Sequence, residues 1–221
     1  SQKDPYDSFE WLDSIHKQKN LSPIYFILCA QNTSAFDKNT STSNPAMQEL
    51  IMHLSKKYTL GIHPSYYADV NNDALTQEQK TLEHLMNKQT SISRQHYIKN
   101  QIPDCYHQLL KSNITDDYSM GYGTHMGFRA GSSSSFLWYD IEKENTTTLR
   151  IHPFCFMDTT AHYEEKLSAK DAFQELKKMK KILLETNSCL VTVFHNFSLG
   201  TDKEWSGWNT AYENFISECK P

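Results

Sequence analysis

Several apolar runs of this sequence end in side chains that could bind a metal or transfer a proton. The run from Cys189 to Phe194 is apolar and β-branched, and it stops at His195-Asn196. The same pattern recurs along the chain, and the polar residues at the predicted strand ends are Gln31-Asn32, His63, Arg94 with His96, Asp116-Asp117, Asp158 and His195-Asn196. In a barrel of parallel strands these ends converge on one face, where such folds place their chemistry.

Metal-assisted hydrolysis is the chemistry that these residue types favour. His63 and His96, with an aspartate, could bind a divalent metal such as zinc and leave one position open to water. The metal would lower the pKa of that water and let it attack a carbonyl carbon. Arg94 or Arg129 could orient a neighbouring acid or hold an anionic group.

Each candidate also has a structural interpretation. His63 and His195 are favoured as functional because both end apolar strands, whereas His96 could equally be a hydrogen-bonded structural residue. Asp158 could instead be a helix N-cap or a loop acid, and Asp116-Asp117 is more typical of a turn. The glycines around Arg129 predict a tight loop. Four histidines are expected on the surfaces of helices: His16, His53, His84 and His107.

Strands alternate with helices along most of the chain, which predicts right-handed βαβ units and a parallel sheet or barrel. Expected strands are 24–30, 58–62, 90–93, 114–118, a hairpin of 136–141 and 146–151 that continues to 157, and 189–194. Expected helices begin at Asp4-Pro5, Asn44-Pro45, Thr76, Ile102 and Ser168, and the last carries Trp205, Trp208, Tyr212 and Phe215. Because a helix comes first, one further strand is expected before Pro5.

The composition limits the class of protein. The chain has 221 residues, enough for one domain, and its formal charge of −4 gives no electrostatic footprint for nucleic acid or a membrane surface. No apolar run is long enough for a transmembrane helix. The 5 cysteines form no C-x-x-C pair, and no signal peptide is visible, so we expect free thiols and a cytoplasmic protein. Nucleotide-binding loops and the common hydrolase motifs do not occur.

Five segments together resemble the polysaccharide deacetylase (NodB-homology) superfamily, in particular a divergent bacterial branch. They are Gly61–Tyr66, Ser93–Tyr97, Asp117–Tyr122, Gly127–Gly131 and Phe194–Asn196. The resemblance implies an irregular (β/α)7 barrel that in this chain lacks its first strand. It also implies the removal of N- or O-acetyl groups from carbohydrate polymers.

The family motifs carry over only in part. The metal-binding H-x-x-x-H motif resembles the segment from His63, but its second histidine falls at Tyr67, so His96 is the expected substitute. The arginine loop resembles the segment around Arg129, or alternatively Arg94. The late histidine that acts as general acid resembles His195. The paired aspartates of the first motif, which supply the base and one metal ligand, would precede residue 1.

We therefore expect one barrel domain over residues 1–221, a piece of a longer bacterial protein, that catalyses metal-assisted deacetylation of a glycan. Its expected cofactor is a divalent metal, zinc above others, and its expected partner is a carbohydrate polymer or oligosaccharide. One alternative is a catalytically degenerate barrel that binds glycan without hydrolysis, favoured by Tyr67 in the motif. Another is a metal-dependent hydrolase that acts on a substrate other than a carbohydrate.

Overall fold

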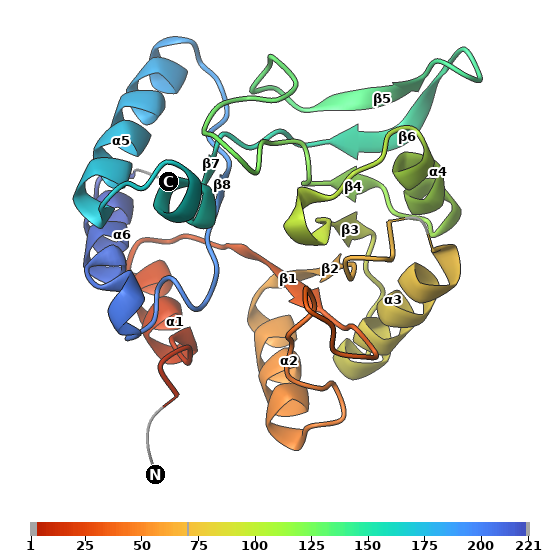
Figure 1. Ribbon diagram of the computed structural model, residues 1–221, viewed down its shortest axis with the longest axis horizontal. Helices are drawn as coiled ribbons and strands as arrows, with labels where there is room; N and C mark the ends of the chain where they lie inside the picture. Colours follow the sequence, from red (N-terminus) through yellow and green to blue (C-terminus); the bar gives the residue numbers. More distant parts are fainter. Residues whose placement is uncertain (1–3, 70, 220–221) are drawn as a thin grey trace. The chain divides into compact units, whose positions relative to one another are not determined.

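The computed structural model describes residues 4–69 and 71–219 (Figure 1). The chain forms two compact units. The six-strand unit comprises Pro23–Met120 and Ser135–Pro153, and the two-strand unit comprises Ser1–Ser22, Gly121–Ser134 and Phe154–Pro221. The organisation of residues 1–221 as one domain remains a prediction.

A mixed sheet forms the centre of the six-strand unit, with the strand order β1-β2-β3-β4-β6-β5. The strands are β1 (Ile24–Leu28), β2 (Thr59–His63), β3 (Ile92–Ser93), β4 (Asp116–Asp117), β5 (Phe136–Asp140) and β6 (Asn145–Ile151). Neighbours from β1 to β6 are parallel, and β5 pairs antiparallel with β6, which confirms the expected hairpin. The parallel strands therefore bring their carboxyl ends to one edge of the sheet.

Helices connect the parallel strands of this unit, as the alternating pattern predicts: α2 (Pro45–Lys57), α3 (Asn72–Met86) and α4 (Asp104–Lys111). The expected start of α2 is confirmed, because the Asn44 side chain accepts the Ala46 N–H and Pro45 is the first helical residue. The expected start of α3 at Thr76 is wrong, since Asn71 accepts the N–H groups of Asp73 and Ala74 instead.

The two-strand unit contains a parallel pair, β7 (Phe156–Met157) and β8 (Thr192–Val193), among helices. The helices are α1 (Phe9–Gln18), a π-helix at Thr160–Glu164, α5 (Ala169–Glu185), a 3₁₀ turn at Lys203–Trp205 and α6 (Trp208–Ser217). Ser168 caps α5 through the Asp171 N–H, as expected. The core of the two-strand unit contains four buried aromatic residues: Phe156, Phe173, Trp205 and Trp208. The aromatic side chains near the last helix therefore form packing surface.

Other expectations at element ends differ from the structure. α1 begins at Phe9 and not at Asp4-Pro5, because the Asp4 side chain instead accepts the Tyr6 N–H in a local turn. The run from Cys189 contributes only two residues to a strand, and Cys189 itself is exposed. The strand expected at 114–118 is confirmed by β4, so Asp116 and Asp117 pair with β3 and β6 and do not form the turn that the aspartate pair alone suggests.

The strands of the described residues form two separate sheets, so the structure shows a mixed α/β fold with a parallel sheet and no closed barrel in that part of the chain. The (β/α)7 barrel remains a prediction. The strand expected before Pro5 and the aspartates expected before residue 1 lie outside the described residues. Among those residues, no helix has the length and apolar character to cross a membrane.

Gly61 in β2 has little space beside it, and we expect Gly61→Ala to destabilise the protein. An added Cβ would lie 2.7 Å from the Phe26 ring and 2.9 Å from the backbone oxygen of Ile92, so packing must shift. The free energy of unfolding should fall by about 1–3 kcal/mol, as in overpacked cores, in a urea titration. Gly123→Ala is the control, since no atom lies within 4 Å of its added Cβ. An unchanged stability of Gly61→Ala would contradict this packing.

Candidate functional site

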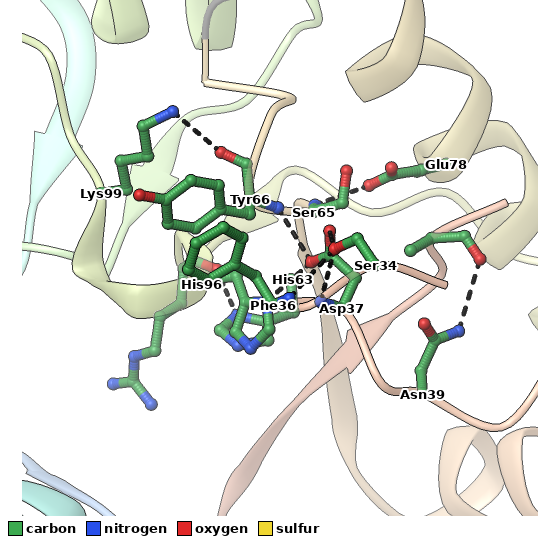
Figure 2. A network of polar contacts seen from close by, with 12 residues as sticks. Ser34, Phe36, Asp37, Asn39, His63, Ser65, Tyr66, Glu78, His96 and Lys99 are labelled. Atoms are coloured by element: carbon green, nitrogen blue, oxygen red, sulfur yellow. Dashed lines mark hydrogen bonds and ion pairs between the residues drawn. The ribbon is translucent and has the colours of Figure 1, made fainter. Parts of the chain in front are cut away.

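The ends of β2 and β3 bring two histidines together in the six-strand unit. His63 is the last residue of β2, and His96 lies in the loop that follows β3. Their ring centroids are 4.8 Å apart (Figure 2). The loop is aligned by backbone bonds, since Arg94 N–H donates to Ile62 O at 3.1 Å and His96 N–H donates to Pro64 O at 3.3 Å. The parallel register therefore explains why residues 33 positions apart meet.

Both imidazole rings are oriented through Nδ1. His63 Nδ1 is 2.5 Å from the backbone oxygen of Arg94, and His96 Nδ1 is 2.9 Å from Asp37 Oδ1. An oxygen acceptor fixes the hydrogen on Nδ1, so Nε2 carries the lone pair of each neutral ring. Metal-binding histidines have this arrangement, in which a carbonyl or carboxylate orients the ring. The pair therefore fits two positions of a metal site.

Asp37, which the sequence did not single out, connects His96 to the loop after β1. It is 3% exposed. Its Oδ1 accepts the Tyr66 N–H as well as the His96 hydrogen, and its Oδ2 accepts the Ser34 hydroxyl (Figure 2). The signal that could have identified it is its isolation, because it is the single acidic residue of the Ser/Thr/Asn-rich stretch 31–44.

Glu78 supports the segment after β2 from the side of α3. Its buried Oε2 accepts the Ser65 N–H at 2.9 Å (Figure 2). Burial raises the pKa of Glu78, and the charge of Asp37 acts in the same direction, while the bonds from Ser65 oppose the rise. Carboxylates from two different segments thus hold consecutive N–H groups of Ser65 and Tyr66.

Arg94 and Asp117 lie beneath the loop after β3 that carries His96. Arg94 is 9% exposed, its Nε donates to Tyr118 O at 3.1 Å, and its guanidinium lies 4.5 Å from the Phe26 ring centre. Asp117 is fully buried and accepts both the N–H and the hydroxyl of Ser119, whose oxygen in turn accepts the Gln95 N–H. Arg94 is thus positioned to stabilise the loop beside Asp117.

The backbone after His96 is strained. Tyr97 and Ile98 have φ angles of 57° and 55°, in the left-handed region that bulky and β-branched residues avoid. Such residues cost on the order of 1–3 kcal/mol each and cluster at functional sites. Lys99 N–H closes the turn onto His96 O at 3.2 Å. Sequence patterns gave no signal for this turn, because neither residue is a glycine or an asparagine.

The only group of three mutually close metal-ligating side chains in residues 4–69 and 71–219 lies elsewhere, at His107, Asp140 and Glu142. His107 Nε2 bonds Asp140 Oδ2 at 2.7 Å, and Lys143 Nζ lies 3.2 Å from the same oxygen. Although burial opposes it, these bonds lower the pKa of Asp140. His107, expected as a surface residue, is a half-buried hydrogen-bond partner of Asp140 at the end of β5. Within the described part of the chain, His63 and His96 belong to no such group of three.

A second candidate group, in the two-strand unit, pairs Asp158 with His195. Asp158 follows β7, His195 lies just beyond β8, and the parallel register aligns the two ends. Asp158 is fully buried, and its oxygens accept His195 Nδ1–H and the His195 backbone N–H, both at 2.6 Å. It also accepts the Ser198 hydroxyl. A buried carboxylate on Nδ1 directs the chemistry of the ring to Nε2.

His195 remains accessible while its ring is held. Its side chain is 30% exposed, and the ring stacks on Phe197 with centroids 4.9 Å apart. Ser198 N–H donates to His195 O at 3.1 Å, which closes the turn. A half-exposed imidazole with a buried carboxylate partner can act as a general acid or base.

Arg129 lies in an exposed bend of the same unit. Gly127 and Gly131 have φ angles of 126° and 65°, and Gly131 N–H donates to Phe128 O at 3.0 Å. The tight loop predicted from the glycines is therefore confirmed. The structure brings His63 together with His96 and Arg94 in one unit, and Asp158 together with His195 in the other.

Comparison with known proteins shows that the fold of this chain is similar to that of a solved structure. No model of a protein family matches the sequence, and no curated protein matches it. A solved structure described as "putative polysaccharide deacetylase from Mycobacterium smegmatis" superposes with a TM-score of 0.66 and 13% sequence identity. The match covers 97% of this chain and 71% of that chain. At this identity the likeness shows the fold alone, which is similar to that of a polysaccharide deacetylase.

The protonation of Asp117 should make stability depend on pH. Burial raises the pKa of Asp117 to about 6, above the value of an unfolded chain. The folded protein therefore binds this proton more tightly, and the resulting stabilisation is complete below about pH 4 and lost as pH rises through about 6. Asp117→Asn has no such proton to lose. Between about pH 4.5 and 7.5, its free energy of unfolding relative to the unsubstituted protein should therefore rise by about 2 kcal/mol in urea titrations.

The exposed Asp73→Asn variant is the control for this comparison, and it should follow the unsubstituted protein at both pH values. If the free energies of unfolding of Asp117→Asn and the unsubstituted protein differ by the same amount at both pH values, burial does not raise the pKa of Asp117.

Proposed function

We propose that this protein is a metal-dependent carbohydrate deacetylase that hydrolyses N- or O-acetyl groups of a glycan. The observation that carries the proposal is the pair His63 and His96, whose Nδ1 atoms are both held by oxygen acceptors. The likeness in fold to a polysaccharide deacetylase supports it. The resemblance of the motif segments to that superfamily supports the choice of a carbohydrate as substrate.

His63 and His96 would hold the metal through Nε2, with Asp37 and the Arg94 carbonyl as outer partners. When bound, a divalent metal such as zinc supplies Lewis-acid polarisation of the acetyl carbonyl and makes a water molecule more acidic. The two histidines fit this role in part, since they supply two ligands. The resemblance assigns a further ligand and the general base to the paired aspartates of the first motif of that superfamily.

His195 would protonate the leaving group. In the reaction that the resemblance implies, water would add to the acetyl carbon and lose a proton to the general base. The C–N or C–O bond would then break, and the Nε2 proton of His195 would pass to the departing amine or alkoxide. Acetate is the second product. Asp158 keeps the hydrogen on Nδ1 and stabilises the positive charge of the protonated ring. The resemblance assigns Arg129, or alternatively Arg94, to orient a neighbouring acid or hold an anionic group.

The second candidate function is glycan binding without hydrolysis. Tyr67 occupies the position where the motif has its second histidine, and its side chain is 56% exposed. A binding protein needs aromatic and polar contacts with the sugar but no metal. Zinc content therefore separates the two candidates.

Zinc binding should depend on both histidines. We expect about one zinc per chain by elemental analysis of the intact protein. His63→Ala and His96→Ala should lose it, and Asp37→Asn, which weakens the orienting bond, should lower zinc affinity about 10–100-fold. His84→Ala is the matched control, because His84 is exposed on α3. Zinc that is retained by both alanine variants would rule out this metal site.

Proton donation should depend on the Asp158–His195 pair. His195→Ala and Asp158→Asn of the intact protein should release acetate from acetylated oligosaccharides about 10²–10⁴-fold more slowly. Zinc content should stay unchanged, because neither residue is assigned as a ligand. His162→Ala serves as control, since His162 lies in the same unit and is half-buried. Acetate release at the normal rate in His195→Ala would exclude its role as the acid.

A further inference from the structure

Four aromatic side chains form a group in the loops of the six-strand unit: Phe36, Tyr66, Tyr67 and Tyr97. Phe36 and Tyr66 stack with centroids 3.9 Å apart and planes inclined by 12°. Tyr97 meets both rings edge-on, at 5.5 and 5.6 Å, and Tyr67 does so at 6.3 and 5.1 Å. The mutual contacts hold the rings in place.

Two members of this aromatic group are largely exposed to water. Tyr67 is 56% exposed and Tyr97 is 58% exposed. A polar rim accompanies them, because Lys99 Nζ lies 4.4 Å from the Tyr66 ring and bonds both Tyr66 O and Asp69. Exposed rings that are rigid and bordered by hydrogen-bonding groups are typical of a ligand-binding surface.

The aromatic group adjoins the candidate metal site. The ring centroids of Tyr97 and His96 are 4.7 Å apart, so Tyr97 connects the rings of Phe36 and Tyr66 to the candidate metal site. Figure 2 labels Phe36, Tyr66 and both histidines in one network of polar contacts. The Tyr66 N–H and the His96 ring share one acceptor, Asp37 Oδ1. The position of Tyr97 is fixed by its left-handed backbone. The same bonds therefore place the aromatic rings and the histidines.

The chemistry of these rings matches a pyranose. A pyranose ring presents a face of C–H groups, which is attracted to the negative face of an aromatic ring, and a rim of hydroxyls for polar partners. We infer that the aromatic group binds a pyranose unit of the glycan chain, next to the unit whose acetyl group lies at His63 and His96. This inference rests on the proposed function for the carbohydrate nature of the substrate.

Glycan binding tests the inference without turnover. Calorimetric titrations would use the full chain in EDTA, with a β-1,4-linked N-acetylglucosamine pentamer and an acetylated β-1,4-xylan hexamer as probes. For a probe that binds, Tyr67→Ala and Tyr97→Ala should each raise the Kd about tenfold. Tyr97→Phe keeps the ring and should stay within about twofold. Tyr139→Ala is the matched control, because Tyr139 is 46% exposed on β5.

The outcomes separate this inference from the proposed function. Binding of neither probe, or alanine variants that bind like the unsubstituted protein, would overturn the aromatic subsite even if acetate is released. Weaker binding in both alanine variants supports it even if no form of the protein releases acetate, in which case the deacetylase proposal alone fails. Circular dichroism of each variant verifies that a loss of binding does not come from unfolding.

Discussion

The hydrogen bonds of the buried Asp37 carboxylate are the interaction on which the candidate site of the six-strand unit depends. One oxygen accepts from both His96 and the backbone of Tyr66, so three loops that follow different strands converge on a single acceptor. A buried carboxylate without these donors would be costly. These donors therefore stabilise the conformation in which the loop after β1 contacts the segments that follow β2 and β3. The same conformation places Phe36 against Tyr66.

The two candidate groups, His63 with His96 and Asp158 with His195, orient their histidine rings in the same way. In each, an oxygen acceptor holds Nδ1 of a histidine that lies at or just beyond the end of a parallel strand, so that Nε2 is the atom assigned to the chemistry. The groups differ in the accompanying partners. His63 and His96 lie next to one another, which suits a shared cation, whereas the His195 ring bonds a fully buried aspartate, which suits proton transfer.

The sequence could predict features that follow from periodicity, and it could not predict those set by hydrogen bonds between distant segments. Alternating strands and helices predicted the parallel sheet, so His63, His96, Asp158 and His195 were all identified at strand ends. Asp37 lies in a loop whose conformation follows from tertiary contacts. Similarly, Asn71 and not Thr76 caps α3, and Gln79, three residues after Thr76, donates to the distant carbonyls of Thr90 and Ser112.

β3 and β4 contribute only two residues each to the sheet, whereas β1 and β2 contribute five. Few ladder bonds therefore anchor the loop that carries His96, and bonds of the Asp117 and Ser119 side chains supplement the other backbone bonds of this loop. Local opening needs less free energy where fewer backbone bonds must break. We therefore expect the amide hydrogens of this loop to exchange faster than those of the β1–β2 ladder.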